Sequence, residues 1–171
     1  LVFDGTAWLP PGFNPVALMG VNTPADTTNR LSVKSPASLF DHAGSDHHLK
    51  VNKAAATDTA SLLFQTGYSG RAEFGTVGDD NFRIKVSPDG TAWTDALTID
   101  KTTGRVGVRT AAPVFDLEVS GLIGSTSPSP GFYLTETDQT TDKRIWRVTS
   151  GGGNFFVQTL NDAGTIAQQG L

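Results

Sequence analysis

Short stretches of alternating apolar and polar residues, separated by turn-forming residues, recur along most of this chain of 171 residues. A period of two places neighbouring side chains on opposite faces of a strand, so each stretch predicts a half-buried β-strand. Turns about every eight to twelve residues are typical of an all-β sandwich, barrel or fibre. We expect strands at residues 29–34, 48–52, 60–66, 71–75, 80–87, 92–100, 105–109, 114–119, 132–134, 144–148 and 154–158.

The pentapeptide Asp-Gly-Thr-Ala-Trp occurs twice, at residues 4–8 and 89–93. The second copy lies between two alternating runs, and Asp-Gly tolerates the positive φ angles of a tight hairpin turn. We therefore expect a hairpin with its turn at Asp89 and Gly90. The first copy leads into Pro10 and Pro11, which predict a linker after the end of a preceding domain.

The composition favours strands and turns over helices, because the chain has 22 Thr, 19 Gly and 9 Pro but only three Glu. The Ala-rich stretch at residues 54–56 predicts at most one helical turn. The absence of cysteine excludes disulfides, thiolate catalysis and Cys-based zinc sites. A unit of about 60 residues buries only about 60% of its surface on folding, so we expect association with further copies.

The charged residues argue against two classes of partner. The formal net charge is −4, and the 13 Lys and Arg residues are scattered along the chain. A nucleic-acid binder instead gathers basic residues on one face. No apolar run approaches the roughly 20 residues that span a bilayer, and no signal-peptide pattern opens the sequence. We expect neither nucleic acid binding nor membrane insertion, and Leu1 in place of Met indicates part of a longer protein.

The segment Phe3-Asp4-Gly5-Thr6-Ala7-Trp8, together with residues 29–37 and 49–73, resembles phage-type fibre and spike proteins of alphaproteobacterial prophages and gene transfer agents. In that family an N-terminal domain of unknown function closes with Phe-Asp-Gly-x-x-Trp, and a fibre segment follows. The resemblance covers roughly residues 1–110. Residues 104–121 are also similar to a connector of tail fibres, in which the usual form is Gly-Ile-Gly-Thr-x-x-Pro followed by Leu-x-Val-x-Gly. Arg109 stands where that connector usually has Gly.

The resemblance implies an elongated, hairpin-rich all-β fibre whose modules interlock as a homotrimer. It implies a structural virion fibre or head spike of a bacteriophage or gene transfer agent, made in the bacterial cytoplasm. Its expected partners are further copies of itself, other virion proteins and host surface polysaccharide. We expect no enzymatic activity and no cofactor. The expected parts are the end of a preceding domain with a linker at 1–15, a first β module at 16–112, a connector at 113–131 and a second, incomplete β module at 132–171.

Four aromatic residues are candidates for binding a sugar, namely Trp93, Tyr68, Trp146 and Tyr133. Each offers a flat apolar face with a polar handle, which matches the mixed faces of a sugar ring. The alternative is that these rings belong to the core, because the chain has few other large apolar residues.

The residues His42, Asp46, His47 and His48 are candidate metal ligands, since imidazole and carboxylate suit several divalent ions. In a trimer, one histidine per chain near the axis could supply three ligands. The alternative is a solvated loop. Ser45 completes the residue types of a hydrolase triad here, but no strained nucleophile turn is present.

Two other functions stay open. The first is a polysaccharide-cleaving spike enzyme, for which Glu73, Glu118 or the pair at residues 79–80 would supply the carboxylates. The second is a monomeric carbohydrate-binding module with an exposed Trp groove. The three glycines at 151–153 precede a predicted strand, so they indicate a hairpin loop and not a phosphate-binding loop.

Overall fold

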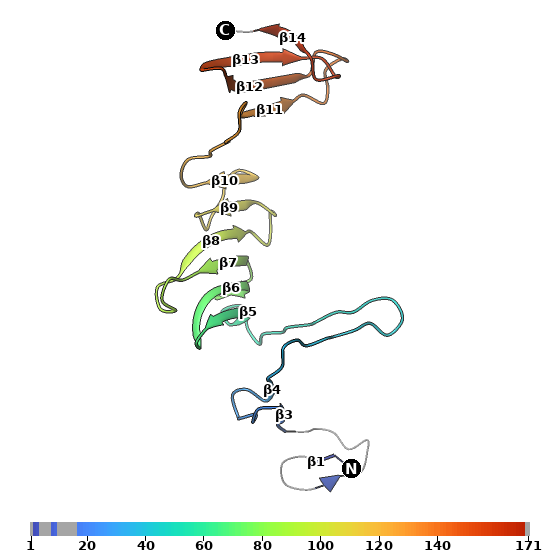
Figure 1. Ribbon diagram of the computed structural model, residues 1–171, viewed down its shortest axis with the longest axis vertical. Coiled ribbons are helices and arrows are strands. Elements are labelled where there is room, and N and C mark those ends of the chain that lie inside the picture. The colour runs from blue at the N-terminus through green and yellow to red at the C-terminus, as the bar shows by residue number, and fades with distance from the viewer. Residues whose placement is uncertain (1, 4–7, 10–16, 170–171) are drawn as a thin grey trace. The chain divides into compact units, whose positions relative to one another are not determined.

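The computed structural model describes residues 2–3, 8–9 and 17–169. Within these residues all regular structure is β, which confirms the predicted all-β class (Figure 1). No helix long and apolar enough to cross a membrane is present in the described part of the chain. The chain divides into two compact units, Leu1–Lys50 and Val51–Leu171. The predicted boundaries at residues 15, 112 and 131 stay predictions.

The first unit contains two small strand pairs. Strand β1 (Val2–Phe3) pairs antiparallel with β2 (Trp8–Leu9), and β3 (Met19–Val21) pairs parallel with β4 (Leu31–Val33). The first Asp-Gly turn and the predicted linker at 10–15 lie outside the described residues. Asp26 shapes the connection between β3 and β4, because its carboxylate accepts hydrogen bonds from the backbone amide of Asn29 at 2.6 Å.

The strand expected at residues 48–52 is wrong, because these residues form no ladder in the chain. Leu49 is 65% exposed and Val51 is 53% exposed. Alternation predicts which side chains would share a face, but a strand also needs a neighbour to accept its backbone hydrogen bonds.

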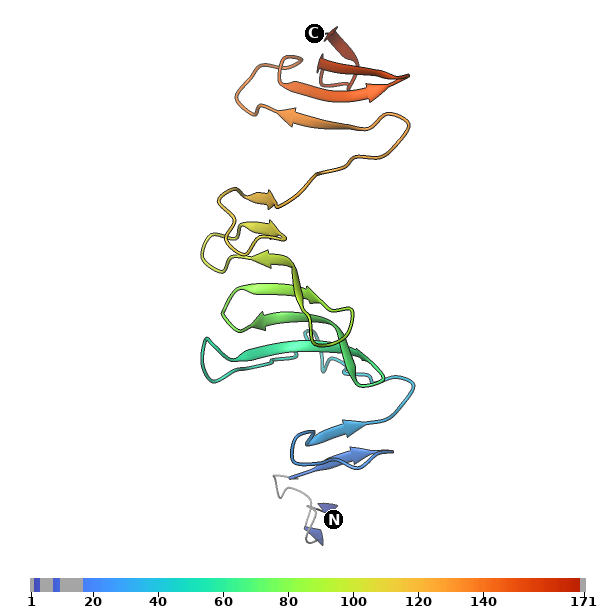
Figure 2. The same cartoon turned by 90° about the vertical axis from the view of Figure 1, so that its left-hand side faces the viewer.

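The second unit begins with a six-stranded sheet of order β10-β9-β8-β7-β6-β5 (Figures 1 and 2). Its strands from β5 to β9 form an antiparallel meander, and β10 pairs parallel with β9. The bounds are β5 Thr59–Thr66, β6 Ser69–Val77, β7 Phe82–Val86, β8 Thr94–Ile99, β9 Val106–Val108 and β10 Leu117–Val119.

The hairpin predicted around the second Asp-Gly is confirmed by the antiparallel pairing of β7 with β8. The predicted tight turn at Asp89 and Gly90 is wrong, because residues 87–93 form a longer connection. In this connection Gly90 has a positive φ and Asp89 does not. The Asp89 carboxylate accepts hydrogen bonds from the backbone amides of Thr91 and Ala92, each at 2.8 Å. These bonds favour the ionised carboxylate and lower the pKa of Asp89 to about 2.

Two other hairpins have the tight turns that glycine permits. Gly67 and Tyr68 connect β5 to β6 with φ values of 54° and 65°. Gly152 and Gly153 connect β12 to β13 with φ values of 55° and 81°, so the predicted glycine hairpin loop is confirmed. Positive φ at both central residues is the pattern of a type I′ turn, which matches the twist of paired strands.

A four-stranded antiparallel sheet of order β11-β12-β13-β14 completes the second unit (Figure 1). Its strands are β11 (Gly131–Thr135), β12 (Ile145–Gly151), β13 (Asn154–Leu160) and β14 (Ile166–Gln169). The sequence did not predict β14, because Ile166 is its only large apolar residue and no alternation marks it. Its pairing with β13 therefore depends on the neighbouring strand.

Candidate functional site

The six-stranded sheet has one continuous apolar face. Directly paired residues of neighbouring strands point to the same side of a sheet, so the register aligns them into rows. One row crosses the sheet from edge to edge and consists of Leu62, Phe74, Ile84, Leu97, Val108 and Val119. The next row contains Phe82, Ile99, Val106 and Leu117. We call these ten residues the first apolar face.

Among the described residues of the second unit, no second layer covers the first apolar face. Leu62 is 44% exposed, Ile84 is 39% exposed and Leu117 is 59% exposed. The ring of Phe74 lies 5.7 Å from that of Phe64 and 6.3 Å from that of Phe82, so the aromatic contacts run within the sheet. The apolar surface that normally faces a core is therefore open to solvent in the isolated chain.

The opposite face of this sheet is mostly polar, and several of its charges are paired. Arg83 Nη1 lies 2.5 Å from Asp95 Oδ2, and Arg83 also pairs with Asp79. The Arg83 guanidinium lowers the pKa of Asp79. Ser61 Oγ donates a hydrogen bond to Glu73 at 2.6 Å. A polar, paired face of this kind is suited to water, so the two faces of the sheet differ in what they can contact.

The four-stranded sheet also leaves an apolar face open. Phe132, Val148 and Val157 form one row across it, and Leu134 pairs with Trp146 in the next. Leu134 is 63% exposed and Phe155, on the same face, is 68% exposed. We call Phe132, Leu134, Trp146, Val148, Phe155 and Val157 the second apolar face. Leu160, the only fully buried large apolar residue among those described, lies on the opposite side.

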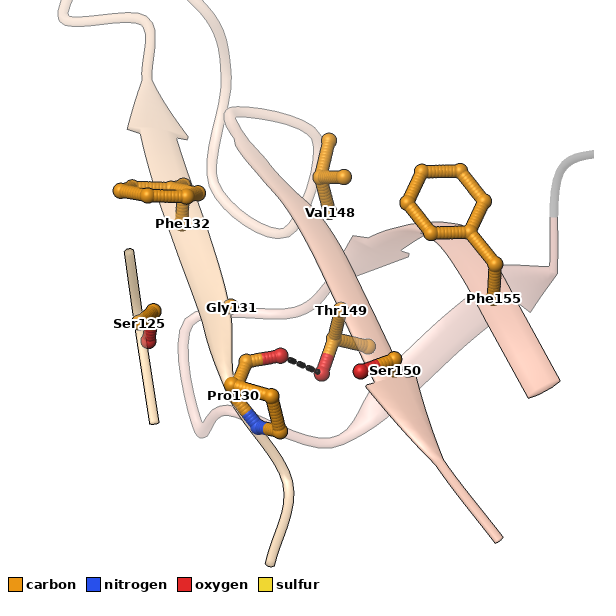
Figure 3. Close-up of a pocket in the computed structure, with 8 residues that line it drawn as sticks. All are labelled: Ser125, Pro130, Gly131, Phe132, Val148, Thr149, Ser150 and Phe155. Atoms are coloured by element: carbon orange, nitrogen blue, oxygen red, sulfur yellow. Dashed lines mark hydrogen bonds between the residues drawn. The ribbon is translucent and has the colours of Figure 1, made fainter. Parts of the chain in front are cut away.

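A pocket of about 190 Å³ opens on the second apolar face (Figure 3). Phe132, Val148 and Phe155 supply its apolar walls, and Ser125 and Ser150 supply hydroxyl groups. Thr149 Oγ1 donates a hydrogen bond to the Pro130 carbonyl at 2.9 Å, which uses its hydroxyl proton. No charged side chain lines the pocket. An apolar side chain fits this chemistry better than a charged ligand does.

The four predicted sugar-binding aromatics do not form one site. Tyr68 is 95% exposed at the turn between β5 and β6. Tyr133 and Trp146 belong to neighbouring strands but point to opposite faces, because Tyr133 pairs with Arg147 and Trp146 pairs with Leu134.

Trp93 is half-buried on the polar face of the six-stranded sheet. A Cβ added to Gly70 would lie 2.7 Å from Trp93 Cζ2, so the ring packs directly against this glycine. Its Nε1 donates a hydrogen bond to the Gly90 carbonyl at 3.3 Å, and Lys85 Nζ lies 5.9 Å from the ring centroid. These contacts support the core interpretation of this residue.

The predicted metal ligands His42, Asp46, His47 and His48 lie in an exposed segment without regular structure. In the described part of a single chain, no group of three or more His, Cys, Asp or Glu side chains could hold a metal ion. The ring of His47 lies 6.3 Å from that of Phe40. A metal site on a trimer axis stays a prediction.

The carboxylates suggested for glycan cleavage make local contacts. Glu73 accepts the hydrogen bond from Ser61, and Glu118 accepts one from the backbone amide of Val114 at 2.7 Å. Asp80 Oδ1 lies 2.9 Å from Lys53 Nζ. Lys53 Nζ also donates to the Asp79 carbonyl at 2.7 Å, so this pair fastens the segment before β5 to the turn between β6 and β7.

The described contacts thus identify two open apolar faces, a polar paired face and dispersed aromatic residues. Comparison with known proteins found no matching family model and no matching curated protein.

Proposed function

We propose that this chain is a structural module of a virion fibre or spike, built as a homotrimer that attaches a phage-like particle to the host surface. One observation carries the proposal: each sheet of the second unit has an apolar face whose residues are exposed or only partly buried. The virion setting and the contact with host polysaccharide rest on the sequence resemblance to fibre and spike proteins.

Further copies of the same chain are the partner that suits these faces. Every copy presents the same two apolar faces, so in a closed symmetric assembly each face can pack against its counterpart in the other copies. The polar face of the six-stranded sheet then stays outside the assembly, so its Arg83 and Asp95 ion pair loses no further contact with water. Faces without charge also match the charge-poor centre of permanent interfaces.

The shorter strands of both sheets fit an assembly of three copies. Packed sheets lie about 10 Å apart, so the side chains of one sheet fill about 5 Å. In a triangular prism made of three sheets, each sheet lies about 5 Å from the axis and is therefore about 17 Å wide. A strand that crosses this width at roughly 3.4 Å per residue has about five residues. Strands β7 and β11 have five residues and β8 has six, whereas β12 and β13 have seven and β6 has nine and extend past this width. The longer β5 has a bulge between Phe64 and Gln65, which ends its regular pairing near this width.

Sedimentation equilibrium of the purified chain at micromolar concentration tests the assembly. We expect a species of three 18.0 kDa chains, about 54 kDa. A stable monomer at these concentrations would refute the proposal. A fluorescently labelled trimer should also adsorb to host cells and lose this binding after the surface polysaccharide is removed enzymatically. Binding that survives this removal would contradict the proposed receptor class.

A further inference from the structure

A polar row crosses the face of the four-stranded sheet that lies opposite the second apolar face. Tyr133 of β11 pairs with Arg147 of β12, and Arg147 pairs with Gln158 of β13. The register therefore brings an aromatic ring, a guanidinium group and an amide side by side on three neighbouring strands. We call these three residues the Tyr-Arg-Gln row.

Gln158 holds the guanidinium of Arg147 in one orientation. Its Oε1 accepts hydrogen bonds from Arg147 Nε at 3.1 Å and from Nη2 at 2.5 Å. Gln158 is only 2% exposed, so its own side chain is fixed by packing. An Arg side chain that is already ordered loses little conformational entropy when it binds a ligand.

Tyr133 flanks the same guanidinium on the side away from Gln158. The Arg147 Cζ atom lies 6.0 Å from the centroid of the Tyr133 ring, and Nη1 lies 3.5 Å from the Tyr133 hydroxyl. Tyr133 is 60% exposed, so much of its ring surface is open to a ligand. The row thus combines a donor group with an accessible aromatic face.

The charge of Arg147 has no partner within the described residues. Arg83 and Arg144 are both paired with Asp side chains. No carboxylate of the described chain lies within ion-pair distance of Arg147, and the same holds for Arg30, Arg71, Arg105 and Arg109. Arg147 differs from these four in that one side-chain oxygen, Gln158 Oε1, accepts from two of its nitrogens. The chain has a net charge of −4, so it does not lack carboxylates. Gln158 accepts from Nε and Nη2, and the Tyr133 hydroxyl accepts from Nη1 at 3.5 Å, which leaves one proton on each of Nη1 and Nη2 without a partner. We call these two protons the free edge of Arg147, and they can donate to the oxygens of a planar anion.

We propose that the Tyr-Arg-Gln row binds the carboxylate of a uronic-acid sugar in an acidic surface polysaccharide. The free edge of Arg147 donates hydrogen bonds to the carboxylate, and the exposed Tyr133 ring packs against the apolar face of the sugar. A single positive charge matches one carboxylate better than it matches a doubly charged phosphate monoester.

This inference rests on the proposed function, because closing the apolar faces around an axis leaves the Tyr-Arg-Gln row on the outside. Three copies would present three equivalent sites to a repeating polymer. Binding several repeats at once raises the apparent affinity by about 100-fold or more over one site, provided the spacing allows it.

The test measures binding of the full chain to immobilised polygalacturonate by biolayer interferometry at low salt. Carboxyl-reduced polygalacturonate and dextran sulfate are the comparison surfaces. We expect binding to polygalacturonate and at least about tenfold weaker binding to the reduced polymer, because each carboxylate contact is charge-assisted. Equal binding to the reduced polymer would overturn the inference, and so would a preference for dextran sulfate.

Variants identify the site. Arg147→Gln and Tyr133→Leu should each weaken binding at least about tenfold. Arg147→Lys should weaken it too, because Lys keeps the charge but lacks the planar fork. Arg30→Gln is the matched control, since it removes the same charge from an exposed position in the first unit and should leave binding unchanged.

Binding that falls equally in Arg30→Gln and Arg147→Gln would show nonspecific charge attraction and overturn the inference. Sedimentation of each variant separates the two proposals. If the wild-type chain is a trimer but does not bind polygalacturonate, the sugar site alone is refuted. If the wild-type chain is a monomer, the proposed assembly is refuted.

Discussion

Replacing Ile84 by Ala tests the first apolar face at its centre. Ile84 is 39% exposed in the isolated chain, and full burial of an Ile side chain contributes about 1.5–3 kcal/mol. Covering its exposed part therefore contributes about 1 kcal/mol per chain, or about 3 kcal/mol per trimer. Losing this contribution lowers the association constant about 100-fold. The midpoint concentration varies with the square root of that constant, so we expect it to rise about tenfold.

The assay is sedimentation equilibrium over a dilution series of wild type, Ile84→Ala and Lys85→Ala. Lys85 is the matched control, because it neighbours Ile84 on β7, points to the polar face and lies 4.0 Å from Asp95. We expect its midpoint to stay within about twofold of wild type, since Lys85 lies on the face that the assembly leaves uncovered and its contact with Asp95 is long. An Ile84→Ala midpoint that does not move, or that moves only as much as the Lys85→Ala midpoint, would refute the burial of this face.

Three further substitutions test local features of the six-stranded sheet. Gly70→Ala places a Cβ 2.7 Å from Trp93 Cζ2, so urea unfolding should show a loss of about 1–3 kcal/mol, and an unchanged midpoint would contradict this packing. Arg109 has a φ of 57°, and Arg109→Gly should raise the free energy of unfolding by up to about 1 kcal/mol in thermal melts; a loss of stability would contradict the strain. Folding lowers the pKa of Asp89 from 3.8 to about 2, so its stabilisation is complete above its unfolded pKa and is lost as the pH falls toward 2. Asp89→Asn keeps an acceptor oxygen and should reduce the slope of stability against pH between those values; an identical slope would contradict this role.

The strands that the sequence predicted best are those whose signals are local. β6, β7 and β8 alternate clearly and are bounded by turn residues, and all three form. Residues 48–52 alternate equally well but form no strand, because no neighbour accepts their backbone bonds. The turn at Asp89 also differs from expectation. The backbone amides of Thr91 and Ala92 donate hydrogen bonds to the Asp89 carboxylate and stabilise a longer connection. Local patterns specify faces and turns, whereas pairing depends on distant residues.

The candidate sites were harder to predict for the same reason. Alternation shows that Phe74 and Ile84 each point to one side of a strand, but only the register aligns them in a row across the sheet. The contact between Arg147 and Gln158 likewise depends on the pairing of β12 with β13. Neither residue carries a motif, so the sequence pointed to Tyr133 and missed its two neighbours.

The solvent accessibility of a single introduced thiol tests most directly whether the first apolar face lies between copies. The chain has no cysteine, so each variant carries one reactive group. Ile84→Cys probes the first apolar face and Thr59→Cys probes the opposite face, and both positions are exposed in the isolated chain. At concentrations far above the assembly midpoint, we predict that a maleimide reagent labels Thr59→Cys rapidly and Ile84→Cys slowly. Equally rapid labelling of the two thiols would contradict the assembly.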